Sequence, residues 1–150
     1  MFANDNAGVV DLLIVPTNPR ILYASTWRVQ RTHYSLSSGG EGSALLKSTD
    51  RGETWTEIST KKGFPEGTLG IIGVTVSPVN NQRVWALVEN KENGGLHRSD
   101  DGGDTWTQVN SERDFRQRAW DYTRLYEDTK DVNTVYVLNV RYHKSTDGGK

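Results

Sequence analysis

The sequence predicts an all-β protein built from consecutive four-stranded antiparallel units. Short runs of β-branched and aromatic residues alternate with turns of Pro, Asn, Asp and Gly, which recur roughly every 8 to 12 residues. One motif returns at intervals of about 50 residues, the usual mark of a repeat architecture. No window carries a convincing helical stripe of apolar residues. Together these observations favour repeated β-sheets over any helical or mixed fold.

The recurring motif has the pattern S-x-D-x-G-x-T-W and occupies 48–55 and 99–106, beginning again at 145–150. Its Asp carboxylate is expected to accept hydrogen bonds from backbone N–H groups about two residues further on, and its Gly to supply the positive φ of a tight turn. The Ser hydroxyl adds a bond, and the Trp covers the turn while its indole N–H seeks an acceptor. We therefore interpret the following residues as structural: Ser48, Asp50, Gly52, Trp55, Ser99, Asp101, Gly103, Trp106, Ser145, Asp147 and Gly149.

A second element recurs in step with the motif. In each unit a first strand leads through a Pro or Asp turn into a second strand, a third strand enters the motif and a fourth leaves at its Trp. The first strands are predicted at about 9–15, 71–77 and 122–127, and the second strands at about 20–27, 82–89 and 134–140.

Four antiparallel strands in about 50 residues are typical of a β-propeller blade. Blade one is predicted at about 9–58, blade two at about 70–109 and blade three, without its fourth strand, at about 121–150. Closed propellers use roughly 4 to 8 blades. Residues 1–150 are therefore expected to form a partial β-propeller of about two and three-quarter blades, a fragment whose partners include the remaining blades of the parent propeller.

These repeats resemble Asp-box (BNR) repeats, which occur in sialidases, xyloglucan-degrading hydrolases, sortilin-type receptor ectodomains and photosystem assembly factors. The resemblance covers essentially the whole chain, and more narrowly the pattern is similar to large bacterial proteins labelled sortilin-like or glycosyl-hydrolase-like. It implies a propeller fold and a secreted or periplasmic protein. It does not imply one function, because hosts of the repeat include enzymes, receptors and assembly factors. A WD40 assignment lacks the Gly-His to Trp-Asp signature, and kelch spacing does not overlay the motif.

Composition excludes several classes of function. The 150 residues carry 18 basic and 19 acidic side chains, so a net charge of −1 favours neither nucleic acid nor an anionic bilayer as partner. The sequence contains no run of roughly 18 apolar residues, so membrane insertion is not predicted. The absence of Cys removes disulfides, zinc-thiolate sites and thiol nucleophiles. No ligand spacing indicates a metal, and no motif indicates a cofactor.

Alternation of strand direction predicts which end of the sheets binds a ligand. Turns joining first to second and third to fourth strands must share one end, and the other end receives the longer segments 28–42, 59–70, 90–94 and 110–121. Segment 28–42 reads equally as a Gly/Ser-rich covering loop or as a ligand contact. Segment 112–122 alternates guanidinium groups with aromatic rings, a pattern suited to recognition of a carboxylate, a sugar or a phosphate. The same pattern is equally typical of a solvated rim of Arg–Asp pairs. The candidate ligand-binding residues are Arg28, Arg31, Arg116, Arg118, Trp120 and Tyr122.

Three functions stay open from the sequence. The first is recognition of an extended ligand, a polysaccharide or a peptide, on the end that carries these segments. The second is glycoside hydrolysis, which needs two carboxyl groups roughly 5 to 9.5 Å apart; Asp114 and Asp121 are the foremost candidates, although the segment contains no complete catalytic set. The third is an architectural scaffold whose blade edges are internal interfaces.

Overall fold

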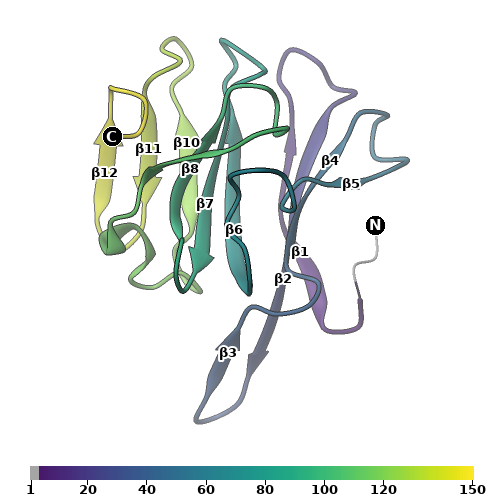
Figure 1. Cartoon of the computed structure of the whole chain (residues 1–150), viewed down its shortest axis with the longest axis vertical. Helices are drawn as coiled ribbons and strands as arrows, with labels where there is room; N and C mark the ends of the chain where they lie inside the picture. Colours follow the sequence, from purple (N-terminus) through teal and green to yellow (C-terminus); the bar gives the residue numbers. More distant parts are fainter. Residues whose placement is uncertain (1–3) are drawn as a thin grey trace.

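The protein folds into three antiparallel sheets that stand side by side. The computed structural model describes residues 4–150, and Figure 1 shows the sheets following one another in chain order. Within these residues the one helix is the 3₁₀ helix η1 (Arg113–Arg116), and none is long and apolar enough to cross a membrane. The all-β prediction is confirmed. We call the three sheets blades one, two and three.

Within each blade the strands are arranged side by side in chain order, so that each strand pairs with the next one along the chain. The strands of blade one are β1 (Ala7–Ile14), β2 (Leu22–Arg31), β4 (Ala44–Ser48) and β5 (Thr56–Glu57), with β3 (Leu36–Ser38) paired to the far end of β2. Blade two contains β6 (Leu69–Val76), β7 (Val84–Asn90), β8 (Gly95–Ser99) and β9 (Thr107–Asn110). Blade three contains β10 (Arg124–Glu127), β11 (Val135–Leu138) and β12 (Tyr142–Ser145).

The apolar cores lie between blades, and strand β7 contributes to both. Val84, Ala86 and Val88 belong to the cluster shared with blade one. Trp85 and Leu87 belong to the cluster shared with blade three. This explains why β7 is a continuous apolar run, because a strand buried on both faces shows no polar alternation. Blade two is therefore held by a neighbour on each side.

The S-x-D-x-G-x-T-W turn is closed by its own side chains. In blade one, Asp50 Oδ1 accepts the backbone N–H of Thr54 at 2.9 Å and Oδ2 accepts the Thr54 hydroxyl at 2.5 Å. The Ser48 hydroxyl donates to Asp50 at 2.7 Å and accepts the N–H of Gly52 at 2.8 Å. The carboxylate thus bonds four residues ahead, further than the two expected from the sequence. These bonds, those from Thr54 first, lower the pKa of Asp50 to about 2.

Blade two repeats this turn, and blade three forms the part that the chain contains. Asp101 accepts the N–H of Thr105 at 2.8 Å, and the Ser99 hydroxyl accepts the N–H of Gly103 at 2.8 Å. Burial opposes ionisation of Asp101, yet bonds from Thr105 and Ser99 outweigh it and lower its pKa to about 2. In the third turn the Ser145 hydroxyl donates to Asp147 at 2.8 Å and accepts the N–H of Gly149 at 2.8 Å.

The tryptophans that follow the first two turns differ in how they are satisfied. The indole N–H of Trp55 donates to the carbonyl of Gly52 at 3.0 Å. The indole nitrogen of Trp106 is buried without a hydrogen-bond partner among the described residues, and its ring packs edge-on against Phe64 with centroids 5.2 Å apart. One Trp therefore closes its own turn, whereas the other joins the core between blades one and two.

Two successive residues of each turn have a positive φ. Gly52, Gly103 and Gly149 have φ of 90°, 99° and 92°. The residue before each of them is also left-handed, and it is Gly102 (φ 72°) or Gly148 (φ 80°) in blades two and three but Arg51 (φ 69°) in blade one. Arg51 is the one non-glycine residue with positive φ in residues 4–150. Its backbone conformation is one that side chains disfavour.

All the turns of this kind lie at one end of the blades, as the alternation predicts. In each blade the left-handed residue donates its N–H to the turn joining the first two strands: Arg51 to Arg20, Gly102 to Gln82 and Gly148 to Asn133. We call this the turn end. Figure 1 shows the β2–β3 hairpin and η1 at the opposite end, which we call the loop end.

Segment 28–42 is not the loop without structure of its own that the sequence led us to expect. Strand β2 continues to Arg31 and β3 pairs back on it, with Val29 opposite Ser38 and Arg31 opposite Leu36. At the tip the N–H of Thr32 donates to the carbonyl of Ser35 at 2.8 Å, which closes the reversal. The segment is an extended β-hairpin that projects beyond the sheet (Figure 1).

The sequence predicted segment 59–70 at the loop end, but the structure places only part of it there. The N–H of Trp106 donates to the carbonyl of Lys62 at 2.9 Å, and a Cβ on Gly63 would lie 1.9 Å from the carbonyl oxygen of Trp106. Phe64 is buried between Trp106 and His97. The first half of this segment therefore fills the space between blades one and two, because blade one alone cannot cover that apolar surface.

Glu127 is a buried carboxyl group at the end of β10. It is 8% exposed, and neither carboxylate oxygen has a hydrogen-bond partner among the described residues. Burial raises its pKa to about 7 against the opposing effect of Trp85, Ser77 and Arg83. In the unfolded chain the carboxyl group has its ordinary pKa, so the folded state keeps a proton that the unfolded state has already lost.

Replacement of Asp101 by Ala should destabilise the protein by about 1–3 kcal/mol, because the backbone N–H and hydroxyl of Thr105 and the hydroxyl of Ser99 lose their acceptor. The matched control is Asp104→Ala, in the same turn and exposed. Chemical denaturation compares the two with the parent protein. Equal stability of the parent and Asp101→Ala would contradict the role assigned to the carboxylate.

Glu127→Gln tests the buried carboxyl group through pH. Stability from protonated Glu127 is present below pH 4.5 and is lost as the pH rises toward 7, so the variant, which keeps a neutral group, should gain about 3 kcal/mol relative to the parent across that interval. Urea unfolding at pH 4.5 and 7.5 measures the difference. A difference that does not change with pH would show that Glu127 titrates normally, and exposed Glu112→Gln serves as the control.

Candidate functional site

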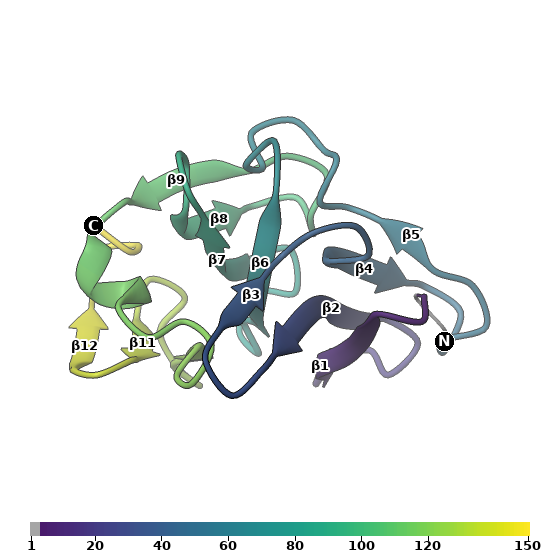
Figure 2. The ribbon, with the colours of Figure 1, turned by 90° about the horizontal axis from the view of Figure 1, so that it is seen from below.

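A cavity of about 580 Å³ opens at the loop end between blade one, blade two and the segment that links blade two to blade three. We call it the junction pocket. It is lined by the end of β3, the start of β6, the end of β7 and the helix η1, which Figure 2 shows from this end. Its lining residues are Ser38, Thr68, Gly70, Glu89, Asn90, Lys91, Arg113 and Arg116. Blade one, blade two and the linking helix η1 thus contribute to one concave surface, the usual setting of a ligand site.

Glu89 is the fixed carboxylate of the junction pocket. Its Oε2 accepts the hydroxyl of Ser38 at 2.5 Å and the backbone N–H of Ile71 at 3.0 Å. A Cβ at Gly70 would lie 2.1 Å from the same oxygen, so only glycine leaves room for the carboxylate there. Oε1 accepts no hydrogen bond from the described residues. Glu89 therefore joins blade one to blade two and keeps one oxygen available to a ligand.

Arg116 forms the opposite wall and is held by backbone carbonyls. Its Nη1 donates to Asn90 at 2.9 Å and its Nη2 donates to Ser111 at 3.2 Å. Burial, followed by the nearby charge of Arg113, lowers the pKa of Arg116, whereas Glu89 acts in the opposite direction. The guanidinium group is thus oriented before any ligand arrives. Arg113 and Lys91 are exposed, and neither forms an ion pair within residues 4–150.

The loop after η1 carries exposed aromatic rings on a buried base. Phe115 and Ala119 are buried, and the side-chain amide of Asn139 donates to the carbonyls of Phe115 at 3.0 Å and Tyr122 at 2.6 Å. Trp120 is 40% and Tyr122 46% exposed. The loop is therefore anchored from below while its aromatic side chains face solvent, as planar stacking on a ligand requires.

The structure brings some of the sequence-predicted ligand residues together and separates others. Arg118 pairs with Asp121 at 2.6 Å and lies over the ring of Tyr122, with its guanidinium carbon 5.7 Å from the ring centroid. Arg28 is committed to the hairpin, because its Nη1 donates to Ser37 and to the carbonyl of Gly39. Arg31 lies at the exposed hairpin tip. Of the six predicted residues, only Arg116 lines the junction pocket.

The two carboxylates predicted as foremost catalytic candidates lie outside the junction pocket. Asp114 accepts the side-chain amide of Gln117 at 2.7 Å and lies 3.8 Å from Arg141. Asp121 is paired with Arg118. Sequence reasoning missed Glu89, although a signal was present: Glu89 ends a run of five apolar residues, where a carboxylate has to find a polar partner.

No group of three or more His, Asp or Glu side chains is arranged to hold a metal ion in the part of the chain that the structure describes. His97 is fully buried beside Phe64, with Nδ1 3.2 Å from the carbonyl of Gly95, and burial lowers its pKa to about 4. His97 therefore packs in the core between blades one and two.

Comparison with known structures decides the fold. Over 96% of its length the chain superimposes on 38% of YCF48 from Cyanidioschyzon merolae, a β-propeller, with a TM-score of 0.54 and 12% sequence identity. The chain has the fold of part of a β-propeller. The three sheets are blades, and the loop end is one face of the propeller. No family model matches the sequence.

A sequence relative is similar along nearly the whole chain. It is described as a probable oligoxyloglucan-reducing end-specific xyloglucanase of Neosartorya fischeri, and it is 30% identical over 151 residues, which is 95% of this chain. The chain spans 17% of the length of that relative. These blades are therefore similar to part of a protein described as a probable xyloglucanase.

Asn139→Ala should loosen the loop that carries Trp120 and Tyr122, because the carbonyls of Phe115 and Tyr122 both lose their donor. The expected cost is about 1–3 kcal/mol of stability, with faster amide hydrogen exchange across 116–122. Asn93→Ala is the control, since no hydrogen bond of the Asn93 side chain is seen within residues 4–150. Unchanged exchange in 116–122 would exclude Asn139 as the anchor.

Proposed function

We propose that this chain is part of a β-propeller that binds an oligosaccharide across its loop end, with the junction pocket as the central subsite. The observation that carries the proposal is Glu89, a carboxylate fixed on one oxygen and available on the other, in a cavity that Arg116 also lines. The similarity to a xyloglucanase supports a carbohydrate rather than a peptide as the ligand.

The chemistry of the loop end suits a sugar chain. Hydroxyl groups both donate and accept hydrogen bonds, so a carboxylate such as Glu89 and cations such as Arg113 and Lys91 serve them together. The exposed rings of Trp120 and Tyr122 offer flat apolar surfaces to the faces of sugar rings. Arg118 stacks on Tyr122 and keeps that ring in place.

The turn end has no part in this proposal. We infer that its S-x-D turns are Asp-boxes whose carboxylates are committed to their own turns, since Asp50 and Asp101 each hold a threonine hydroxyl and a backbone N–H. Ligand recognition and blade closure are thereby assigned to opposite ends of the same strands.

A glycoside hydrolase is the second candidate, and Glu89 favours it specifically. In that case Glu89 is one of two carboxyl groups, and the other belongs to blades beyond these 150 residues or to Asp114 or Asp121. The two hypotheses predict different results for Glu89→Gln. An enzyme would lose turnover while retaining ligand within a few-fold, whereas a binding protein would lose affinity and show no turnover at all.

Binding of a xyloglucan oligosaccharide by the complete protein is measured by calorimetry. Trp120→Ala and Arg113→Ala should each weaken binding about tenfold, equivalent to about 1.4 kcal/mol, because each exposed side chain contacts ligand without supporting the fold. The control is Lys130→Ala, an exposed cation at the turn end. Absence of binding by the parent protein, or equal affinities for all variants, would overturn the proposal.

A further inference from the structure

The contact between blades one and two depends on a cation that lies over an aromatic ring. Lys47 of β4 pairs with Tyr23 of β2 in the strand register, and its Nζ is 5.7 Å from the centre of the Tyr23 ring. From there Nζ donates to the carbonyl of Gly102 at 2.7 Å, and the Tyr23 hydroxyl donates to the same oxygen at 2.9 Å. Gly102 is the first glycine of the blade-two turn.

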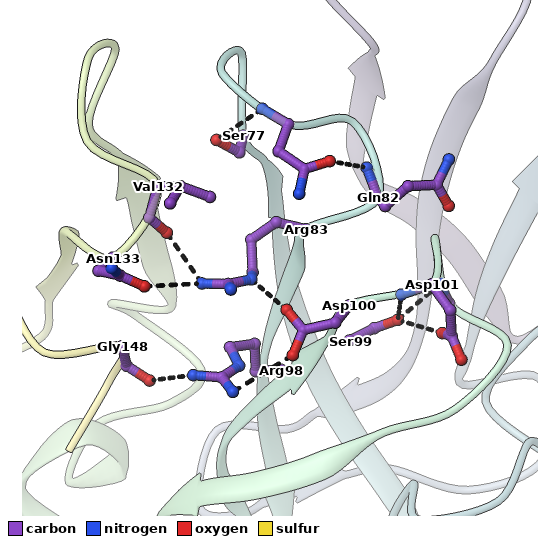
Figure 3. Close-up of polar contacts among 12 residues, drawn as sticks. Ser77, Gln82, Arg83, Arg98, Ser99, Asp100, Asp101, Val132, Asn133 and Gly148 are labelled. Atoms are coloured by element: carbon purple, nitrogen blue, oxygen red, sulfur yellow. Dashed lines mark hydrogen bonds and ion pairs between the residues drawn. The ribbon is translucent and has the colours of Figure 1, made fainter.

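The contact between blades two and three repeats the arrangement one blade further on. Arg98 of β8 pairs with Trp85 of β7, and its guanidinium carbon is 5.9 Å from the Trp85 ring centre. Its Nη1 donates to the carbonyl of Gly148, the first glycine of the blade-three turn, at 3.1 Å. Figure 3 shows Arg98 reaching that carbonyl while Arg83 reaches the carbonyl of Val132 beside it. Blades one and two thus each present a cation, on β4 and β8 respectively, to the turn of the next blade.

Blade three carries the equivalent pair of residues, although the Tyr136 hydroxyl donates to Asp128 at 2.7 Å and no further turn covers the pair within residues 4–150. Lys144 of β12 pairs with Tyr136 of β11, and its Nζ is 5.5 Å from the Tyr136 ring centre. Two pairs further along, on the same face of the sheet, Leu138 faces Tyr142 as Leu87 faces Leu96 in blade two.

The equivalent residues differ sharply in exposure. In blade two Leu87 and Leu96 are buried, whereas in blade three Leu138 and Tyr142 are 38% and 64% exposed. Tyr126, the cross-strand partner of Tyr136, is exposed as well. An exposed apolar surface of this kind, equivalent in position to the faces of blades one and two that are covered, calls for a covering element.

We propose that Tyr126, Tyr136, Leu138, Tyr142 and Lys144 form a docking surface for another blade of the same polypeptide, whose turn begins with glycine and whose glycine carbonyl accepts Lys144. We call this set the blade-three surface. It lies on a face of the sheet, so its role is separate from ligand binding at the loop end.

The requirement for glycine follows from the two occupied contacts. A Cβ on Gly148 would lie 2.6 Å from Arg98 Nη1, and a Cβ on Gly102 would lie 3.1 Å from Lys47 Nζ. Blade one has Arg51 at this position of its turn, with the same positive φ and therefore a Cβ directed at the cation. An S-x-D-G-G turn avoids this contact, whereas the blade-one turn of a second copy of this chain would bring the Cβ of Arg51 close to the cation.

The test uses the complete polypeptide that carries these residues, which contain no cysteine. Tyr142→Cys reports on the blade-three surface, and Val79→Cys, 52% exposed in the turn joining β6 to β7, is the matched control. A charged thiol reagent should label Tyr142→Cys at least tenfold more slowly than Val79→Cys at every protein concentration. Comparable rates would overturn the proposal, and protection that disappears on dilution would do so too, because it would identify a separate molecule as the occupant.

A second set of variants examines the cation itself. Lys144→Ala should raise the labelling rate of Tyr142→Cys at least threefold, and Lys144→Arg should restore slow labelling, because blade two uses Arg98 in the same role. Lys130→Ala should leave the rate unchanged. Equal labelling in all three backgrounds would contradict the role of Lys144. Oligosaccharide affinity should not change in any of them, so failure here is distinguishable from failure of the proposed function.

Discussion

The structure depends on the fact that a blade is apolar on both faces and is stable only between neighbours. Strand β7 makes the constraint visible, since Val84 and Val88 need blade one as much as Trp85 and Leu87 need blade three. Four short strands bury too little surface to fold by themselves, so the energy of folding is concentrated at the contacts between sheets. Blade geometry is therefore set by what the neighbouring blade presents.

The two ends of the strands are under different demands. At the turn end, hydrogen bonds within the Ser99–Thr105 turn and from Arg98 to Gly148 hold backbone groups in one arrangement, which leaves those side chains little freedom for anything else. At the loop end the segments differ from blade to blade in length and composition, and Glu89 and Arg116 line one pocket there because η1 lies beside blades one and two. Variation at one end is tolerated because the other end maintains the packing.

Much of the fold could be predicted from the sequence, because repetition multiplies a weak local signal. The motif at 48–55 and 99–106 placed the turns, and the apolar runs placed the strands within a few residues. The site was harder to predict. Glu89 becomes important through Ser38 of another blade, and Phe64 fills the gap beside Trp106 rather than lying at the loop end. Such contacts join residues far apart in the chain, which a local pattern does not encode.

The hairpin formed by β2 and β3 has a mechanical consequence. Its backbone ladder is continuous with that of blade one, and Arg28 fastens its inner end to the carbonyl of Gly39. A projecting arm of this kind is held to its parent sheet by backbone hydrogen bonds that a free tether lacks, and its conformation is restricted accordingly. Contact between a large polymer and the arm would therefore forfeit little conformational freedom, so even a modest contact area there adds usefully to affinity.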